Sequence, residues 1–343
     1  MDYNRQIGLW LFGVIFLIVI LVIFGGWVRL TRSGLSMVEW KVVSGVVPPL
    51  NAAAWDETFA KYRRTPEYQK VNRGMTLEEF KYIYYREYGH RILGRLAGLA
   101  FVVPLVVFLV RGALPRRRIP AFLGIGILFA VQGVVGWFMV KSGLVDQPQV
   151  SHYRLTLHLL CALALLGACL WFGFKYSFAV PATGAPLSAS PFFKRLALVF
   201  TGAVCLQITA GALTAGLKAG YISATFPTMF GQWIPTGLWR LQPWIMNALE
   251  NPVLVHFQHR WFGFVVAALA LALLVQVRRE PALPHLRTGV RGVLHLILLQ
   301  IALGIGVVVL HVPVWLASLH QAVALGIFGL ALFICYRALG SRP

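Results

Sequence analysis

The stretch YYREYGHRILGR, residues 84–95, places a carboxylate, an imidazole and a guanidinium directly before a long apolar run. These polar side chains belong to Glu87, His90 and Arg91, and the apolar run continues to about residue 110. A run of this length is close to the ~20 residues that an α-helix needs to cross the ~30 Å hydrocarbon core of a bilayer. The stretch therefore predicts functional polar side chains where a transmembrane helix begins.

The whole chain has the composition of an integral membrane protein. Of its 343 residues, 58% are hydrophobic and only 12% are charged, which is far from the balance of a soluble protein. We expect eight transmembrane helices, at about 7–28, 92–110, 119–140, 155–174, 196–215, 254–275, 290–310 and 316–336. The first run is longer than the apolar region of a secretory signal, and no small-residue cleavage site follows it, so we expect it to be retained.

Membrane topology, rather than nucleic-acid binding, accounts for the net charge of +20. Short loops rich in Lys and Arg lie on the cytoplasmic side of a membrane. The loops after the second, fourth and sixth expected helices are the basic ones, with Arg111, Arg116, Arg117, Arg118, Lys175, Lys194, Arg195, Arg278, Arg279, Arg287 and Arg291. Both termini are therefore expected in the cytoplasm, and the long segment 29–91 is expected to form a folded outer loop.

The chain repeats itself. YGHRILGRLAGLA at the head of the second expected helix matches FQHRWFGFVVAALA at the head of the sixth, and LTLHLLCALALL in the fourth matches LASLHQAVALGI in the eighth. Duplication of this kind is typical of helical membrane proteins built from pseudo-symmetric halves. We therefore expect an all-α protein of two four-helix bundles, residues 1–175 and 190–343, joined by a cytoplasmic linker at 176–189 that is rich in Pro, Ala, Ser and Gly.

A shorter motif, QxxxG, recurs on three odd-numbered helices. It consists of the pairs Gln132 and Gly136, Gln207 and Gly211, and Gln300 and Gly304. Small residues let membrane helices approach closely, and an amide inside a membrane helix usually bonds to a neighbouring helix. We interpret the glutamines as helix-packing residues.

Four of the nine histidines are candidate metal ligands. His285, His295 and His311 are expected in or near loops, and His152 and His256 open helices where each can face water. The remaining four, on the even-numbered helices at matching places in each half, are His90, His158, His259 and His320. Histidine is the usual axial ligand of b-type heme, and bundle interiors hold such sites.

The positions of these four histidines predict two heme sites, one in each bundle. The topology puts all four toward the outer face, so the hemes are expected side by side rather than one near each face of the membrane. A structural zinc site would want four converging ligands, often thiolates. The cysteines at 161, 169, 205 and 335 are expected within helices, with none in an outer loop, which disfavours zinc.

Three further residues flank the candidate ligands. Arg91 and Arg260 each follow one directly and are expected either to pair with heme propionates or to anchor a helix at the lipid headgroups. Glu87 lies one turn before His90, whereas the equivalent place before His259 is occupied by His256. A carboxylate beside a cofactor can stabilise positive charge or accept a proton, and the alternative for Glu87 is a surface salt bridge with Arg86 or Arg91.

Taken together, these residues resemble the heme A synthase family in the form found in proteobacteria and mitochondria. The matching stretches are GGWVRLTRSGLSMVEWK, MTLEEFKYIYYREYGHRILGR, VQGVVGWFMVKSGL, YRLTLHL, GALTAGLKAGYISATFPTM and ENPVLVHFQHRWFGF. The resemblance implies an eight-helix pseudo-symmetric bundle. It also implies that the methyl at position 8 of heme O is oxidised to the formyl group of heme A by successive hydroxylations, through a geminal diol.

The resemblance also assigns the sites. It implies that His90 and His158 hold the substrate heme O, that His259 and His320 hold the iron of heme b, and that Glu87 is the functional glutamate. Some bacterial members carry cysteine pairs in outer loops, which this sequence lacks.

The implied location is a multi-pass protein of the bacterial inner membrane with heme sites toward the periplasm. Expected partners are heme O, membrane lipid, a heme O synthase, cytochrome oxidase assembly factors and a second copy of the chain, but not nucleic acid. Two alternatives stay open: a di-heme electron-transfer protein resembling quinol oxidoreductases, and a non-catalytic heme carrier.

Overall fold

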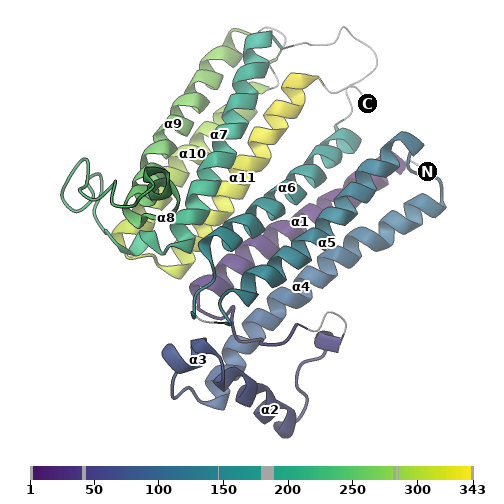
Figure 1. The fold of residues 1–343 in the computed structure, drawn as a ribbon. Coiled ribbons are helices and arrows are strands. Elements are labelled where there is room, and N and C mark those ends of the chain that lie inside the picture. Colours follow the sequence, from purple (N-terminus) through teal and green to yellow (C-terminus); the bar gives the residue numbers. More distant parts are fainter. Residues whose placement is uncertain are drawn as a thin grey trace. The chain divides into compact units, whose positions relative to one another are not determined.

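The fold is helical throughout the part of the chain that the structure describes, which is residues 3–40, 44–145, 147–178, 189–280, 283–284 and 286–340 of a computed structural model. Within these residues the one β pairing is an isolated bridge between Met229 and Gln232. Eight helices are long and apolar enough to span a membrane, which confirms the expected number and the all-α class (Figure 1). They are α1 (Tyr3–Leu30), α4 (Leu77–Val110), α5 (Ile119–Lys141), α6 (His152–Ser177), α7 (Pro191–Gly216), α9 (Pro252–Arg278), α10 (Leu286–Val309) and α11 (Val314–Leu339).

Short helices occupy the segments between these spans. They are η1 (Ser44–Val46), α2 (Ala52–Arg63), α3 (Pro66–Lys70), η2 (Arg116–Arg118), η3 (Ala219–Tyr221), η4 (Trp244–Met246) and α8 (Asn247–Glu250). Asn51 caps the first turn of α2 and Thr65 that of α3, because each side chain accepts a hydrogen bond from a backbone amide three residues on. Within segment 29–91, the described residues 29–40 and 44–91 thus contain capped helices, whereas the expected outer location of this segment stays a prediction.

The chain divides into two compact units, Val14–Leu165 on one hand and Met1–Gly13 with Leu166–Pro343 on the other. We call the first the N-terminal unit and the second the C-terminal unit. Their boundaries fall inside α1 and α6. The predicted halves stay a prediction, and residues 179–188 of the predicted linker lie outside the described residues.

In the C-terminal unit four helices close a ring of contacts. α7 packs against α9 and α11, and α10 packs against the same two helices. Small residues permit this: Gly289 and Gly292 of α10 lie against Leu330 of α11, and Thr201 of α7 donates a hydrogen bond to the carbonyl of Ala331 on α11. Close approach through small residues and hydroxyl bonds is how membrane helices associate, since burial from water does not drive them together inside lipid.

In the N-terminal unit α4 packs against both α1 and α5. Its Gly89 lies against the Phe24 ring of α1, and its Phe101 ring stacks on Phe129 of α5 with centroids 5.1 Å apart. Gly126 of α5 lets the Phe101 ring approach its backbone. Helix α4 is thus held by contacts with both α1 and α5.

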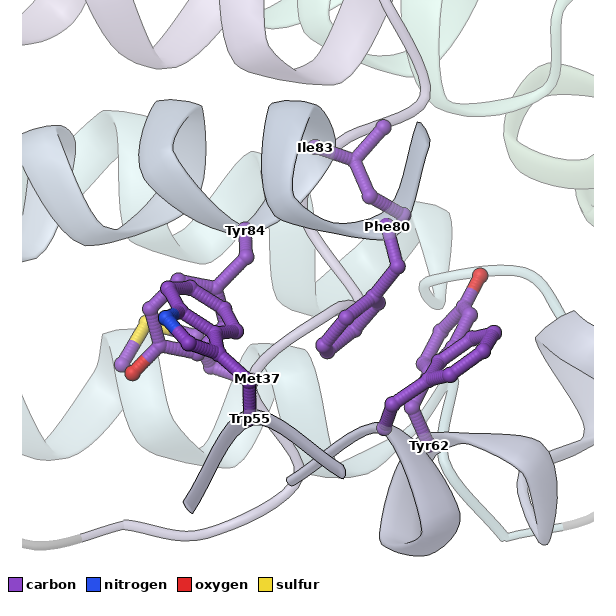
Figure 2. Packing of buried hydrophobic residues seen from close by; sticks show 7 residues of the cluster. Met37, Trp55, Tyr62, Phe80, Ile83 and Tyr84 are labelled. Carbon is purple, nitrogen blue, oxygen red and sulfur yellow. The ribbon is translucent and has the colours of Figure 1, made fainter. Parts of the chain in front are cut away.

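An aromatic cluster anchors the N-terminal turns of α4 (Figure 2). The buried residues of this cluster are Met37, Trp55, Phe59, Tyr62, Phe80, Ile83 and Tyr84. Phe80 of α4 stacks on Phe59 and Tyr62 of α2, with centroids 5.0 and 4.9 Å apart. Stacked aromatic pairs contribute about 0.5–1.5 kcal/mol each beyond the burial of their area. The cluster therefore fixes the start of α4, three turns before His90.

The start of α4 also carries the expected capping box. The Thr76 hydroxyl accepts from the Glu79 amide, and the Glu79 carboxylate accepts from the Thr76 amide at 2.8 Å. Two backbone amides that would otherwise lack partners are thereby satisfied. From this cap the helix runs without a break to Val110, so it carries Glu87, His90 and Arg91 in its N-terminal half.

Candidate functional site

The four candidate ligands divide between the two compact units. His90 on α4 and His158 on α6 belong to the N-terminal unit, whereas His259 on α9 and His320 on α11 belong to the C-terminal unit. The pairs expected from the repeat therefore each lie within one unit. His285 lies outside the described residues.

Each of the four imidazoles rests on a glycine of the preceding spanning helix. The glycines are Gly25 on α1 for His90, Gly136 on α5 for His158, Gly211 on α7 for His259 and Gly304 on α10 for His320. A Cβ atom at residue 25 would lie 2.8 Å from a ring atom of His90, and at each of the other three the distance to the ring would be 3.0 Å. Because even an alanine would crowd the ring, glycine is what lets each histidine reach the neighbouring backbone.

The two imidazoles of the C-terminal unit face each other. Their ring centroids are 6.4 Å apart and the ring planes are inclined by 81°. Two imidazoles bound to opposite sides of one metal ion, with metal–nitrogen bonds of ~2.0–2.1 Å, have centroids roughly 6 Å apart. The spacing of His259 and His320 thus fits a shared metal ion.

The nitrogens of these rings also fit a ligand role. The Nδ1 atoms of His158, His259 and His320 are buried and have no hydrogen-bond partner. Buried polar nitrogens normally have one, and an imidazole nitrogen that carries no proton can bind a metal ion. Among the described residues no group of three or more His, Cys, Asp and Glu side chains comes together. A cofactor that brings most of its own metal ligands needs only a pair of side chains from the protein, and His259 and His320 form such a pair in the C-terminal unit.

Glu87 is buried, with 4% of its surface exposed, and its carboxylate is fully engaged. Its Oε2 accepts from the Ser36 amide at 2.8 Å, the Ser36 hydroxyl at 2.7 Å and the Met37 amide at 2.9 Å. Its Oε1 pairs with Arg91 Nη2 at 2.5 Å. The salt bridge considered for Glu87 therefore exists with Arg91, but it is buried rather than on the surface.

Arg86, the other partner considered for Glu87, has a different environment. Its guanidinium lies 4.6 Å from the ring centroid of Trp27 and 3.8 Å from that of Tyr82. Cation–π contacts of this kind contribute about 0.5–1 kcal/mol at exposed positions. Arg86 thus stacks on aromatic rings, whereas Arg91 forms the ion pair with the Glu87 carboxylate.

Arg91 and Arg260 bind the loops that precede their helices. Arg91 donates to the carbonyls of Met37 and Glu39, and its guanidinium lies 5.1 Å from the Trp40 ring. Each arginine also bonds to the side chain four residues before it, Glu87 for Arg91 and His256 for Arg260.

Arg260 repeats this arrangement in the C-terminal unit. It donates to the carbonyls of Ser223, Thr225 and Thr228, and its Nε donates to His256 Nε2 at 3.0 Å. The two arginines therefore hold equivalent loops over equivalent helices. Pairing with propionates stays a prediction.

Known proteins match this chain over nearly its whole length. A family profile described as Cytochrome oxidase assembly protein (COX15-CtaA) matches residues 8–332, which include all eight spanning helices in whole or in large part. The chain belongs to this family. Among its relatives is a protein of Nitrosospira multiformis named Heme A synthase, 42% identical over 334 residues, which cover 96% of this chain and 93% of the relative.

Two further relatives carry the same name. The protein of Sinorhizobium fredii is 43% identical, with 96% of this chain and 89% of the relative covered. The protein of Agrobacterium fabrum is 40% identical, with 99% and 92% covered. The similarity thus covers most of the length of both units.

Arg91 was among the expected partners of Glu87, but the Ser36 and Met37 donors and the glycines beneath the rings were not expected from the sequence. Ser36 is 51 positions from Glu87, and a bond over that separation leaves no periodic signal. The glycines did leave one, because Gly136, Gly211 and Gly304 close the three QxxxG motifs. That motif was interpreted as helix packing, which the structure confirms for Gln132 and Gln207, whose amides donate to carbonyls of the next helix.

Proposed function

We propose that this chain is a heme A synthase, a membrane oxidoreductase that converts heme O to heme A. The observation that carries the proposal is the similarity of 40–43% to proteins of that name over nearly the whole length of both chains. The reaction oxidises the methyl at position 8 of heme O to a formyl group by successive hydroxylations. The protein spans the membrane several times, in keeping with its eight apolar helices.

We further propose that each unit holds one heme. His90 and His158 would hold heme O in the N-terminal unit, and His259 and His320 would hold heme b in the C-terminal unit. The 6.4 Å spacing of the second pair and the unpartnered Nδ1 atoms support this assignment. When bound, heme b supplies one-electron transfer that carries electrons away from the substrate.

Glu87 is proposed to assist the oxidation. It lies one turn before His90, where a carboxylate can stabilise positive charge that develops on the substrate or accept its proton. Three donors and Arg91 hold the carboxylate in one place, so its charge is preorganised. The same bonds tie residues 36–39 to α4, which gives Glu87 a structural role as well.

The heme sites are proposed to lie toward the periplasmic side of a bacterial inner membrane. The distribution of Lys and Arg between the loops supports this orientation. A heme O synthase would supply the substrate, and cytochrome oxidase assembly factors would receive the product. A second copy of the chain is a further expected partner.

Chromatography of extracted heme tests the proposed function. Membranes that contain this chain together with a heme O producer should yield heme A or its hydroxylated precursor, which membranes with the producer alone should lack. A di-heme electron carrier or a heme carrier would return heme O unchanged, and that result would overturn the proposal.

A Glu87→Gln variant separates the two roles of the glutamate. Glutamine retains an acceptor oxygen for the loop amides but lacks the charge. We expect it to retain both hemes in the absorption spectrum and to convert heme O about a hundredfold more slowly or worse, because loss of one acid–base or electrostatic group typically costs at least that much. Conversion at the parental rate with both hemes bound would remove Glu87 from the chemistry.

A further inference from the structure

The helix that precedes each candidate ligand carries a side chain four residues before the ring-supporting glycine. At three of these positions it is glutamine, namely Gln132, Gln207 and Gln300. At the fourth, which serves His90, it is Leu21. This difference in residue type distinguishes the helix that precedes His90 from the helices that precede the other three candidate ligands.

Leu21 and Gln207 occupy the same place in their units. The Gln207 amide nitrogen lies 3.4 Å from the position of a Cβ atom at Gly263, four residues after His259. A Leu21 methyl lies 4.0 Å from the corresponding position at Gly94, four residues after His90.

The glutamine adds a bond that leucine lacks. Gln207 Nε2 donates to the backbone carbonyl of His259 at 2.9 Å, and Gln132 Nε2 donates to that of His158 at 3.2 Å. In a membrane such a bond between helices resists both sliding and rotation of the ligand helix. A leucine contributes only dispersion contacts, which have no preferred direction.

We propose that the glutamines are positioning residues that lock the candidate ligand histidines. In the same proposal, Leu21 leaves His90 the least constrained of the four, so that the heme held by His90 exchanges faster than the heme held by His259 and His320. This deepens the proposed function, because it rests on the assignment of heme O to the N-terminal unit and heme b to the C-terminal unit. A substrate heme must enter and leave, whereas a resident heme must stay.

The test measures heme loss from the purified full-length holoprotein to excess apomyoglobin. Chromatography of the captured heme separates heme O and heme A from heme b and so reports each unit. The parental protein should lose its substrate or product heme faster than its heme b. Gln207→Leu should speed the loss of heme b by roughly 3- to 15-fold, the range expected for one hydrogen bond between membrane helices.

The reciprocal variant, Leu21→Gln, should slow the loss of heme O and heme A by a similar factor and leave that of heme b unchanged. It should also narrow the absorption band of the N-terminal heme, because the ligand orientation becomes more uniform. Gln207→Met serves as the matched control for size, and it should behave as Gln207→Leu does.

Unchanged heme b loss in Gln207→Leu together with unchanged heme O loss in Leu21→Gln would overturn the proposal. If Gln207→Leu does not assemble, Gln132→Leu in the N-terminal unit and Leu21→Gln decide the question alone. These rates need bound heme but no turnover. A protein that binds both hemes and fails to convert heme O would refute the proposed function and leave this inference standing.

Discussion

His259 owes its position to the absence of a side chain at residue 211 of α7. A Cβ atom there would lie 3.0 Å from the His259 ring, so the ring or the helix must shift by a few tenths of an ångström to accept one. Glycine inside a helix costs about 1 kcal/mol relative to alanine. Its use at four equivalent positions therefore indicates a requirement for close approach rather than for helix stability.

We predict that Gly211→Ala lowers the retention of heme b and shifts its absorption maximum, because the ring moves off its present axis. Gly202→Ala on the same helix is the matched control, since nothing lies within 4 Å of a Cβ atom there. Absorption spectra of the two purified variants give the answer. Equal heme content and equal spectra would show that the ring tolerates the added methyl.

Arg91 and Glu87 form a buried ion pair in the N-terminal half of α4. The side chain of Arg91 is 9% exposed and that of Glu87 is 5% exposed, so neither charge is well solvated. Removing one partner of a buried pair leaves the other charge uncompensated, which costs about 3–5 kcal/mol. We predict a loss of this size in the free energy of unfolding for Arg91→Ala, measured by denaturation in detergent. Arg86→Ala should cost no more than about 1–2 kcal/mol, because it removes only stacking on two rings. Equal losses in the two variants would contradict the assigned role of the buried pair.

At the scale of elements, α2 packs against the N-terminal turns of α4 through the aromatic cluster. Burial raises the pKa of Tyr62 to about 12, and the Tyr62 hydroxyl accepts a hydrogen bond from Asn72 at 2.7 Å. An acid whose folded-state pKa lies above its unfolded value of ~10 stabilises the fold below that pH. The contribution is then lost as the pH rises from about 10 to about 12.

We predict that the difference in ultraviolet absorbance between the parental protein and Tyr62→Phe shows one tyrosinate that forms near pH 12 rather than near pH 10. Resistance of the α2 segment to limited proteolysis should fall as the pH rises from about 10 to about 12. In Tyr62→Phe the fall should be smaller. If the tyrosinate in the difference spectrum forms near pH 10, the Tyr62 hydroxyl is exposed to water, which would contradict its burial in the cluster.

At the scale of the whole molecule, the features set by local sequence were predictable and those set by distant contacts were not. The eight helices follow from runs of apolar residues near 20 in length, and the start of α4 follows from Thr76 and Glu79. The binding of Ser36 by Glu87 joins residues 51 positions apart, and no spacing rule reports it. The facing of His259 and His320 was predicted only because the chain repeats.

The central claim is that each unit holds its own heme between two imidazoles. The most direct measurement is chromatography of the heme retained by full-length His90→Ala and His259→Ala variants, with His295→Ala as the control. His259→Ala should lose heme b and retain heme O, His90→Ala should lose heme O and retain heme b, and His295→Ala should retain both. Loss of the same heme from both ligand variants, or of neither, would contradict the claim.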